Sequence, residues 1–270
     1  MSFNIRNDND GDKGLNSWKV RKDKVASVIR FHHTDIVGLQ EVLKDQLEYL
    51  DSHLSEYDFI GVGRDDGEDA GEFVPIFYRK DRITLEDWGA FWLSETPEVK
   101  GSMGWDAACV RVTTWGKFKD RRTNQIFFFF NTHFDHMGQV AMEKSAYLLL
   151  DKVEEIAADL PAIIVGDFNN TPDSKAYRIL TNSHGNALKD SKLVSKNGHY
   201  GCEFSFHGFD ALELLKRVQR GSIDSVSQLI DFIFIKNEID VINHAILADN
   251  WDGVFPSDHM PVVADLKVDE

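Results

Sequence analysis

The sequence predicts an α/β protein in which mainly antiparallel strands form a β-sandwich and helices cover its outside. Apolar stretches of strand type outnumber stretches with helical periodicity. Several predicted strands also follow one another through short polar loops, whereas a doubly wound parallel sheet needs a crossover helix after each strand. We find no linker, internal repeat or low-complexity segment, so we expect one domain over residues 1–270.

The first quarter of the chain alternates strands and helices. Strands are expected at Ser2–Arg6 and at Asp35–Gln40, which runs into Glu41. Between them, Trp18–Phe31 places apolar residues on one face at helical spacing and Lys and Arg on the other. Asp45–Leu54 repeats this spacing with leucines and is the second predicted helix.

The middle of the chain is rich in predicted strands. Tyr57–Gly63 and Phe73–Arg79 are two of them, separated by a polar loop. Ala108–Trp115 and Gln125–Thr132 are predicted to form a hairpin around the basic segment Lys117–Arg122. The second hairpin strand contains a run of phenylalanines, which is too short for a helix and suits a strand buried on both faces.

The last part of the chain begins with the strongest helical pattern, at Gln139–Ala158. A strand over Pro161–Val165 then leads into Asp167, and a helix is expected near Ser174–Leu180. Residues 181–228 show no clear periodicity apart from a helix at Ala211–Arg220. Three strands are expected to close the chain: Ile230–Ile235, Ala245–Ala248 and Val262–Val268.

Composition limits the class of protein. A hydrophobic content of 42% with 11% aromatic residues in 270 residues supports a large packed core. The net charge of −15 and the pI near 5.1 argue against general adhesion to nucleic acid or anionic lipid, although a local basic groove remains compatible with them. The two cysteines, Cys109 and Cys202, are too few for a disulfide framework or a thiolate metal site. One bridge is left open, but we expect two buried free thiols.

The N-terminal segment carries no secretion signal, because Met1–Arg6 lacks a basic region followed by an apolar one. A cytoplasmic protein is the default expectation, and secretion remains open if a leader was removed. No apolar run has the length needed to cross a membrane, so we expect no membrane insertion.

Polar residues with chemical potential follow the apolar strand Pro161–Val165. They belong to the segment Gly166-Asp167-Phe168-Asn169. An Asp can coordinate a hard cation or hold a water, and an Asn amide can donate to an anionic oxygen. A strand that ends in an Asx turn gives the same residues, so this segment alone does not establish a site.

Other polar residues lie at or near predicted strand ends: Asn4, Glu41, His133, Asp231, and Asp258 with His259. Structural roles are open for several of them; Glu41, for example, could simply begin a helix. Asp231 is harder to explain in this way, because it lies between Ile230 and Phe232 in an apolar strand. A buried ionised carboxylate needs a partner, and a histidine is a natural one.

Taken in order, these segments resemble the signature of the endonuclease/exonuclease/phosphatase superfamily, which has the DNase I-like fold. The segments are Phe3-Asn4-Ile5-Arg6, Leu39-Gln40-Glu41, Asn131-Thr132-His133, Gly166-Asp167-Phe168-Asn169, Ile230-Asp231-Phe232-Ile233 and Ser257-Asp258-His259. The resemblance implies a four-layer α/β sandwich, a divalent cation and phosphoester hydrolysis. Residues 166–180 are most similar to the Ccr4-like branch, and other segments resemble an uncharacterised bacterial group.

The resemblance also implies roles for single residues. Glu41 corresponds to the metal ligand, with Asn4 nearby and Asp258 as a further carboxylate at or near the metal. Asp167 corresponds to the group that holds or deprotonates the attacking water. Asn169 and His133 correspond to phosphate donors, and Asp231 and His259 to a paired carboxylate and imidazole.

Three arginines are candidates for substrate contact. Some relatives carry an acidic residue where this chain has Arg6, so a second metal contact is doubtful there and a phosphate contact is the alternative. Arg111 is a second phosphate candidate, with an ordinary sheet-surface role left open. Arg64 is the third, and it could instead pair with Glu72 and fix a loop.

These observations lead to an expected function. We expect a hydrolase that depends on Mg²⁺, with Mn²⁺ as a plausible substitute, and that acts as a monomer on a small phosphoester or a short nucleic-acid end. An endonuclease or exonuclease on DNA or RNA is the alternative, and an inactive binding module on the same fold is a further one. No long basic stripe is evident that could track a polyanion.

Overall fold

The computed structural model describes residues 1–183 and 185–268. Its strands form two sheets. In spatial order, the first sheet contains β10 (His199–Gly201), β12 (Ile239–Ile246), β13 (Val262–Val268), β1 (Ser2–Asn4), β2 (Ile36–Gln40), β4 (Ile76–Arg79) and β3 (Tyr57–Ile60). The second contains β5 (Ile83–Trp92), β6 (Val112–Asp120), β7 (Ile126–His133), β8 (Ala162–Asp167), β11 (Asp231–Lys236) and β9 (Lys189–Asp190).

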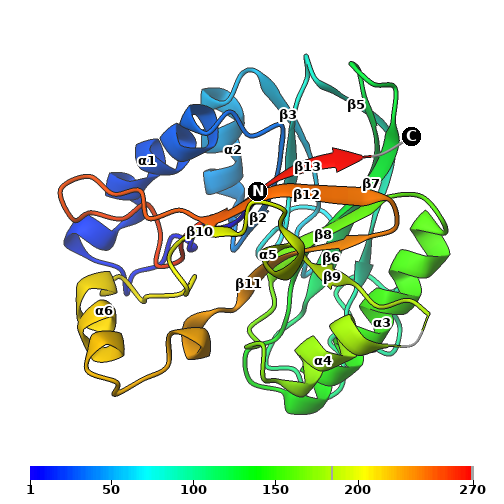
Figure 1. Ribbon diagram of the computed structural model, residues 1–270. Helices are drawn as coiled ribbons and strands as arrows, with labels where there is room; N and C mark the ends of the chain where they lie inside the picture. Colours follow the sequence, from blue (N-terminus) through cyan, green and yellow to red (C-terminus); the bar gives the residue numbers. More distant parts are fainter. Residues whose placement is uncertain (184, 269–270) are drawn as a thin grey trace.

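Helices cover both outer faces of this sandwich. Figure 1 shows α1 (Trp18–Phe31) and α2 (Lys44–His53) on one side of the sheets, and α3 (Gln139–Ala157) and α4 (Lys175–Asn182) on the other. The short helix α5 (Ser191–Val194) and α6 (Ala211–Gln219) lie in the segment between β9 and β11. The four-layer sandwich implied by the resemblance is therefore confirmed.

The predicted strand directions are also confirmed. Parallel pairing occurs between β1 and β2, between β10 and β12, and between β7 and β8. The other pairs between described strands are antiparallel. The sheets are thus mixed and mainly antiparallel.

Some predicted boundaries were wrong. The strand β5 was not expected, because Glu86, Asp87 and Gly89 interrupt its apolar pattern at a β-bulge. The strand expected at Ala245–Ala248 is the end of the longer β12. Lys117 and Lys119 lie inside β6, opposite β7, so the basic segment is largely part of the strand.

Asn131 in β7 links the two sheets close to the ends of their strands. Its Nδ2 donates to the carbonyls of Leu39 at 2.8 Å and Pro75 at 2.9 Å, and its Oδ1 accepts from Gln40 Nε2 at 2.7 Å. The sheets approach so closely here that a Cβ on Gly38 would lie 2.5 Å from a methyl group of Val165. The hydrogen bonds of Asn131 fix the position of β7 relative to β2.

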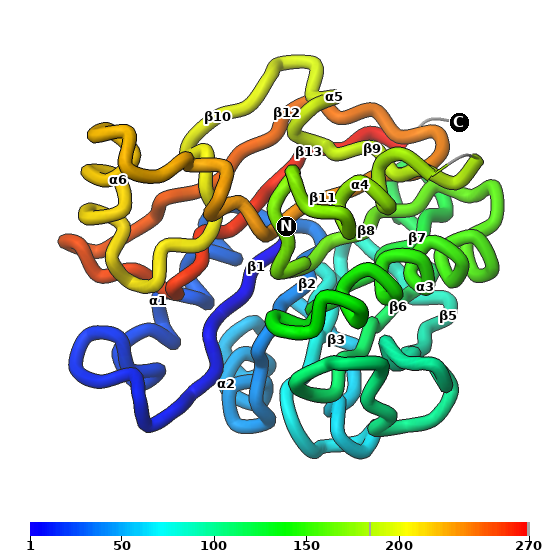
Figure 2. The backbone as a smooth tube through the Cα atoms, turned by 90° about the horizontal axis from the view of Figure 1, so that it is seen from below, coloured from blue at the N-terminus to red at the C-terminus, as the bar shows by residue number. Residues whose placement is uncertain are grey.

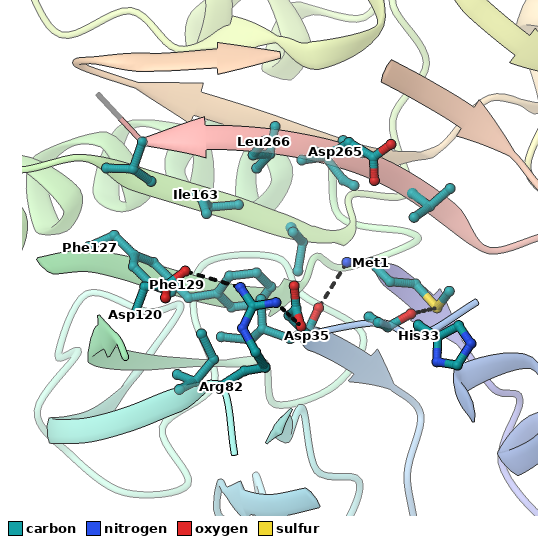
Figure 3. A pocket seen from close by; sticks show the side chains of 18 of the residues that line it. Met1, His33, Asp35, Arg82, Asp120, Phe127, Phe129, Ile163, Asp265 and Leu266 are labelled. Atoms are coloured by element: carbon teal, nitrogen blue, oxygen red, sulfur yellow. Dashed lines mark hydrogen bonds and ion pairs between the residues drawn. The ribbon is translucent and has the colours of Figure 1, made fainter. Parts of the chain in front are cut away.

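A cavity of about 240 Å³ lies between the sheets at the ends where β2, β7 and β8 begin. Figure 3 shows Arg82 in its wall between Asp35 and Asp120, with Phe127, Phe129 and Ile163 nearby. Arg82 lies 3.2 Å from each of these carboxylates. The polar residues discussed below lie at the opposite ends of the same strands.

Candidate active site

The candidate site forms where strand ends from both sheets meet. Asn4 ends β1 and Glu41 follows β2, while His133 and Asp167 end the parallel strands β7 and β8. Asp231 begins β11 and is the direct register partner of Asp167. His259 lies in the segment that leads into β13 and is bridged to Phe206. Sequence positions more than 250 residues apart, such as the Asn4 carbonyl and Ser257 Oγ, thereby come within 2.7 Å.

Three site residues have a left-handed backbone at or just after these strand ends. The φ angles are 59° at Arg6, 60° at Glu41 and 49° at Asn169. This conformation is uncommon for residues other than Gly, and it is concentrated at functional sites where the surrounding structure holds it. It turns the chain sharply at the mouth of the two sheets.

Asn4 holds two carboxylates together. Its Nδ2 donates to Glu41 Oε1 and to Asp167 Oδ2, both at 3.0 Å. Its Oδ1 accepts from the backbone N–H of Arg6 at 2.9 Å. The other Glu41 oxygen accepts from the backbone N–H of Asn7 at 3.1 Å. Asn4 therefore presents its amino group to the carboxylates in this arrangement.

His259 lies between two buried carboxylates. Its Nδ1 is 2.8 Å from Asp231 Oδ2 and its Nε2 is 3.8 Å from Asp167 Oδ2. The ring of Phe206 packs against the imidazole with a centroid distance of 4.9 Å. The pairing of Asp231 with a histidine, expected from the sequence, is present in the structure.

The pKa shifts follow from burial and from these contacts. Burial opposes ionisation of Glu41, but His259 and the N–H donors of Asn4 and Asn7 outweigh it and lower its pKa. Burial and the neighbouring Asp231 raise the pKa of Asp167. Burial alone would lower the pKa of His259, yet Asp231 and Asp167 raise it to about 10. The site therefore contains a charged imidazole at neutral pH.

His133 is neutral, in contrast to His259. Burial and then the nearby Arg111 and Arg64 push its pKa well below the ordinary value of 6.5. Asn169 Nδ2 lies 3.1 Å from His133 Nε2 and donates to the Phe134 carbonyl at 3.0 Å. Because an amide nitrogen donates, His133 Nε2 accepts and its proton resides on Nδ1.

The residues present suit a hard divalent cation. Glu41, Asp167 and His259 each offer a potential ligand atom, and these atoms lie within 4.8 Å of one another. Asp231 Oδ1 is buried and has no hydrogen-bond partner. His259 is protonated and paired, so the oxygen atoms are the better ligands. A few carboxylate oxygens are typical of Mg²⁺ sites, in which several waters complete the coordination.

Arg6 lies among carboxylates. Its Nε is 3.0 Å from Asp12 Oδ2 and 3.8 Å from Asp258 Oδ2, and its Nη1 is 3.9 Å from Glu41 Oε2. Asp258 itself is buried, and this burial raises its pKa. The guanidinium thus places a positive charge at the edge of the Glu41 group.

The other two candidate arginines lie together on the His133 side of the site. Arg64 forms an ion pair with Glu72, which was the alternative expected from the sequence. Arg111 is only 5% exposed, so it is not an open sheet-surface residue. Its Nη2 is 3.1 Å from His136 Nδ1 and its Nε is 3.7 Å from Asp135 Oδ1.

A second group of potential metal ligands, Cys109, Asp135 and His136, is less suitable for a cation. Both Asp135 oxygens already accept backbone N–H groups, from Ala108 on one side and from residues 137 and 138 on the other. Arg111 also points its positive charge at His136 Nδ1. A metal ion would have to displace this arginine.

Several residues that support the site were not predicted from the sequence. Ser205 Oγ accepts the backbone N–H of Asp231 at 3.1 Å, and Ser257 Oγ accepts that of His259 at 3.2 Å. Asn7 connects Glu41 to Glu72 through its backbone and side chain. His136 lies four residues after the predicted strand end at Thr132, so its position was a usable signal; Ser205 and Asn7 lie in loops without such a signal.

A sandwich of two mixed sheets with buried carboxylates, amides and histidines at one end is the architecture of metal-dependent phosphoesterases. The model of the Endonuclease/Exonuclease/phosphatase family matches residues 1–259, and the chain belongs to this family. Its members are metal-dependent phosphohydrolases, including nucleases, phosphatases and phosphodiesterases.

Related proteins cover nearly the whole chain. An endonuclease/exonuclease/phosphatase from Bacteroides vulgatus is 44% identical, with a TM-score of 0.91 and coverage of 99% of this chain and 97% of that one. A mannosyl-6-phosphatase from Bacteroides thetaiotaomicron is 37% identical, with a TM-score of 0.87 and coverage of 98% of both chains. The exoribonuclease subunit Ccr4 of Mycosarcoma maydis is 23% identical over 93% of this chain and 46% of its own length.

Among the described residues, none of the helices combines the length and the apolar character that a membrane span requires.

Proposed function

We propose that this protein hydrolyses a small phosphoester with the help of Mg²⁺, which Mn²⁺ can replace. The observation that carries the proposal is the line Asp231–His259–Asp167 next to Glu41 and Asn4. It combines a charged imidazole, a carboxylate with a raised pKa and a carboxylate with a lowered pKa in one buried group. Separated pKa values of this kind are typical of acid–base catalysis.

Glu41 would hold the cation. Asn4 would orient the Glu41 carboxylate, and Asp258 would add negative charge nearby. The lowered pKa of Glu41 keeps it ionised and able to act as a ligand. The cation would neutralise charge on the phosphate and stabilise the leaving oxygen.

Asp167 would accept the proton of the attacking water. Its raised pKa makes it a stronger base than an ordinary aspartate, and Asn4 Nδ2 and the Asn169 backbone N–H hold its two oxygens in place. Asp231 would keep His259 charged and oriented, so that its Nε2–H stabilises negative charge that develops on the phosphate.

His133 and Asn169 would orient the phosphate. The Asn169 amide group now faces His133 Nε2 and the Phe134 carbonyl, and a phosphate oxygen would compete for the same N–H. Arg6, at the other side of Glu41, offers a fixed positive charge to a phosphate oxygen.

A small substrate is favoured over a long polyanion. The relative described as a mannosyl-6-phosphatase shares 37% identity over nearly the whole length of both chains, whereas the exoribonuclease relative shares 23%. The net charge of −15 also opposes a long anionic ligand. Hydrolysis of an RNA 3′ end is the second candidate function, supported by the Ccr4 relative.

A substrate panel tests the proposal. Purified protein with Mg²⁺ or Mn²⁺ should hydrolyse an aryl phosphate, hexose phosphates or nucleotides, and excess chelator should abolish the activity. The Asp167→Asn variant controls for contaminating phosphatases. An absence of turnover on every substrate, in folded protein with either metal, would contradict the proposal.

A further inference from the structure

A polar group of side chains borders the candidate active site next to His133. It consists of Arg64, Glu72, Arg111 and His136, and we call it the arginine corner. Arg111 contacts Asp135 and His136, which follow His133 by two and three residues. Burial and the charges of Arg111 and Arg64 lower the pKa of His133, consistent with this position. The corner therefore begins beside the side chains proposed to orient the phosphate.

The arginine corner has hydrogen-bonding capacity that the protein does not use. Nε and Nη1 of Arg111 and Nε of Arg64 are buried and have no hydrogen-bond partner. A guanidinium stays charged and only donates, so each of these N–H groups needs an acceptor. Buried donors without acceptors are unfavourable, and interface side chains commonly readjust when a ligand enters. Unused donors in a buried arginine beside the candidate site indicate a ligand that supplies oxygen acceptors.

The charges of the corner indicate which acceptors fit. Arg64 pairs with Glu72 and lies 3.7 Å from Asp65 Oδ1, and Arg111 lies 3.7 Å from Asp135 Oδ1, so two cations already face three carboxylates. A second phosphate would meet repulsion from these carboxylates. A hydroxyl group accepts from an arginine and donates to a carboxylate, so it can satisfy both members of such a pair.

His136 adds a donor of defined direction. Because Arg111 Nη2 donates to its Nδ1 at 3.1 Å, the proton of the neutral ring resides on Nε2. The side chain is exposed, so this Nε2–H is available to a ligand. The corner thus offers several donors and a carboxylate within one small region.

We propose that the arginine corner binds the alcohol half of the substrate and that this half is a neutral polyhydroxylated group such as a sugar ring. This inference rests on the proposed phosphoester hydrolysis and assigns Arg64 and Arg111 to the leaving group instead of the scissile phosphate. Glu72 also contacts Asn7, whose backbone N–H binds Glu41, so the corner is connected to the proposed metal ligand.

Matched substrates test this assignment in the Mg²⁺-loaded full chain. The comparison uses a hexose 6-phosphate, p-nitrophenyl phosphate, adenosine monophosphate and a hexose 1,6-bisphosphate. We expect the hexose 6-phosphate to have the highest kcat/KM. In Arg64→Gln and in His136→Ala, its kcat/KM should fall about tenfold more than that of the aryl phosphate, mainly through KM. His136 is exposed, so its variant should fold even if an arginine variant does not.

Arg79→Gln is the matched control, because Arg79 forms an exposed ion pair with Asp81 away from the site. Equal losses of kcat/KM on the hexose and aryl phosphates would overturn the inference. It would also be overturned if the wild type preferred the nucleotide or the bisphosphate and Arg64→Gln and His136→Ala abolished that preference.

A binding measurement separates this inference from the proposed function. In the Asp167→Asn background, calorimetric affinity for the hexose 6-phosphate should fall with Arg64→Gln, and affinity for phenyl phosphate should fall about tenfold less. If the wild type turns over no substrate but Arg64→Gln still weakens hexose 6-phosphate binding selectively, the proposed function is contradicted and the arginine corner is not. If the wild type hydrolyses the aryl phosphate but Arg64→Gln weakens binding of both ligands equally, the role of the arginine corner is contradicted and the proposed function is not.

Discussion

His259 Nδ1 lies 2.8 Å from Asp231 Oδ2, and both side chains are almost completely buried. The same imidazole points its Nε2 toward Asp167 at 3.8 Å. Asp231 and Asp167 face each other across neighbouring strands, so the backbone pairing of β11 and β8 sets the spacing of the two carboxylates. A single histidine between them relieves their repulsion and keeps its own charge. Figure 2 shows that β8 and β11 lie side by side near the middle of the molecule.

Removal of either partner from the Asp231–His259 pair should have nearly the same effect on catalysis. We expect Asp231→Asn and His259→Ala each to lower kcat by about 100-fold or more, and the double variant to lose little beyond the worse single one. Steady-state kinetics of the four proteins measures this coupling. Asp249→Asn is the control, since Asp249 pairs with His32 outside the site. Additive losses would mean that the two residues act independently.

The same pair should affect stability at alkaline pH. The pKa of His259 is raised to about 10, whereas an unfolded histidine titrates near 6.5. Its contribution to stability is therefore full below pH 6.5 and is lost as the pH rises toward 10. Urea unfolding of the metal-free protein should show a larger loss of stability between pH 6.5 and 9.5 in the wild type than in His259→Gln. Equal losses would contradict the raised pKa.

Glu41→Gln should weaken cation binding with little change in the fold. The substitution keeps the size of the side chain but removes the negative charge that the pKa of Glu41 maintains. We expect Mn²⁺ affinity, followed by electron paramagnetic resonance, to fall at least about tenfold, and kcat by orders of magnitude. Glu48→Gln, on the exposed face of α2, is the matched control. Unchanged Mn²⁺ affinity in Glu41→Gln would exclude Glu41 as a ligand.

Cation binding should release a proton through Asp167. Burial and the Asp231 charge raise the pKa of Asp167, so part of this carboxyl is protonated near neutral pH in the metal-free protein. A cation nearby favours the ionised form, and affinity for the cation should therefore increase with pH between about 6 and 8. Calorimetry in buffers of different ionisation enthalpy measures the released proton. Persistence of the same pH dependence in Asp167→Asn would assign it to another group.

Much of the fold was predictable because its core strands are short apolar runs with clear ends. Phe127–Phe130 is buried throughout, as its composition predicted, and Gln139–Ala157 forms a long helix with one apolar face. β5 was missed because exposed Glu86 and Asp87 lie at a bulge and Gly89 interrupts the apolar pattern, so the local pattern did not reflect its pairing with β6. Boundaries also shifted where pairing extends a strand, as in β12.

The site was predictable to the extent that polar residues at strand ends share one edge. Asp231 in an apolar strand required a partner, and the structure supplies His259. The position of Arg6 between Asp12, Asp258 and Glu41 was not predictable, because it depends on loops that the sequence does not orient. The contacts of Arg111 were likewise not predictable, because its partners Asp135 and His136 lie in the loop after β7.

Small phosphoesters should be better substrates than internal sites in long duplex DNA. Lys117 lies in β6 and pairs with Glu86, and the exposed turn after β6 keeps only Arg121 and Arg122 from the dense basic segment, which are too few cations to track a long polyanion. Enzymes that bind a long polyanion use many such contacts, and their affinity falls steeply with salt. We expect hydrolysis of a hexose or aryl phosphate to change little between 50 and 200 mM salt, and supercoiled plasmid to be nicked slowly at either concentration. Asp167→Asn controls for contaminating nuclease. Efficient nicking at the higher salt concentration, together with poor turnover of every small phosphoester, would contradict this prediction.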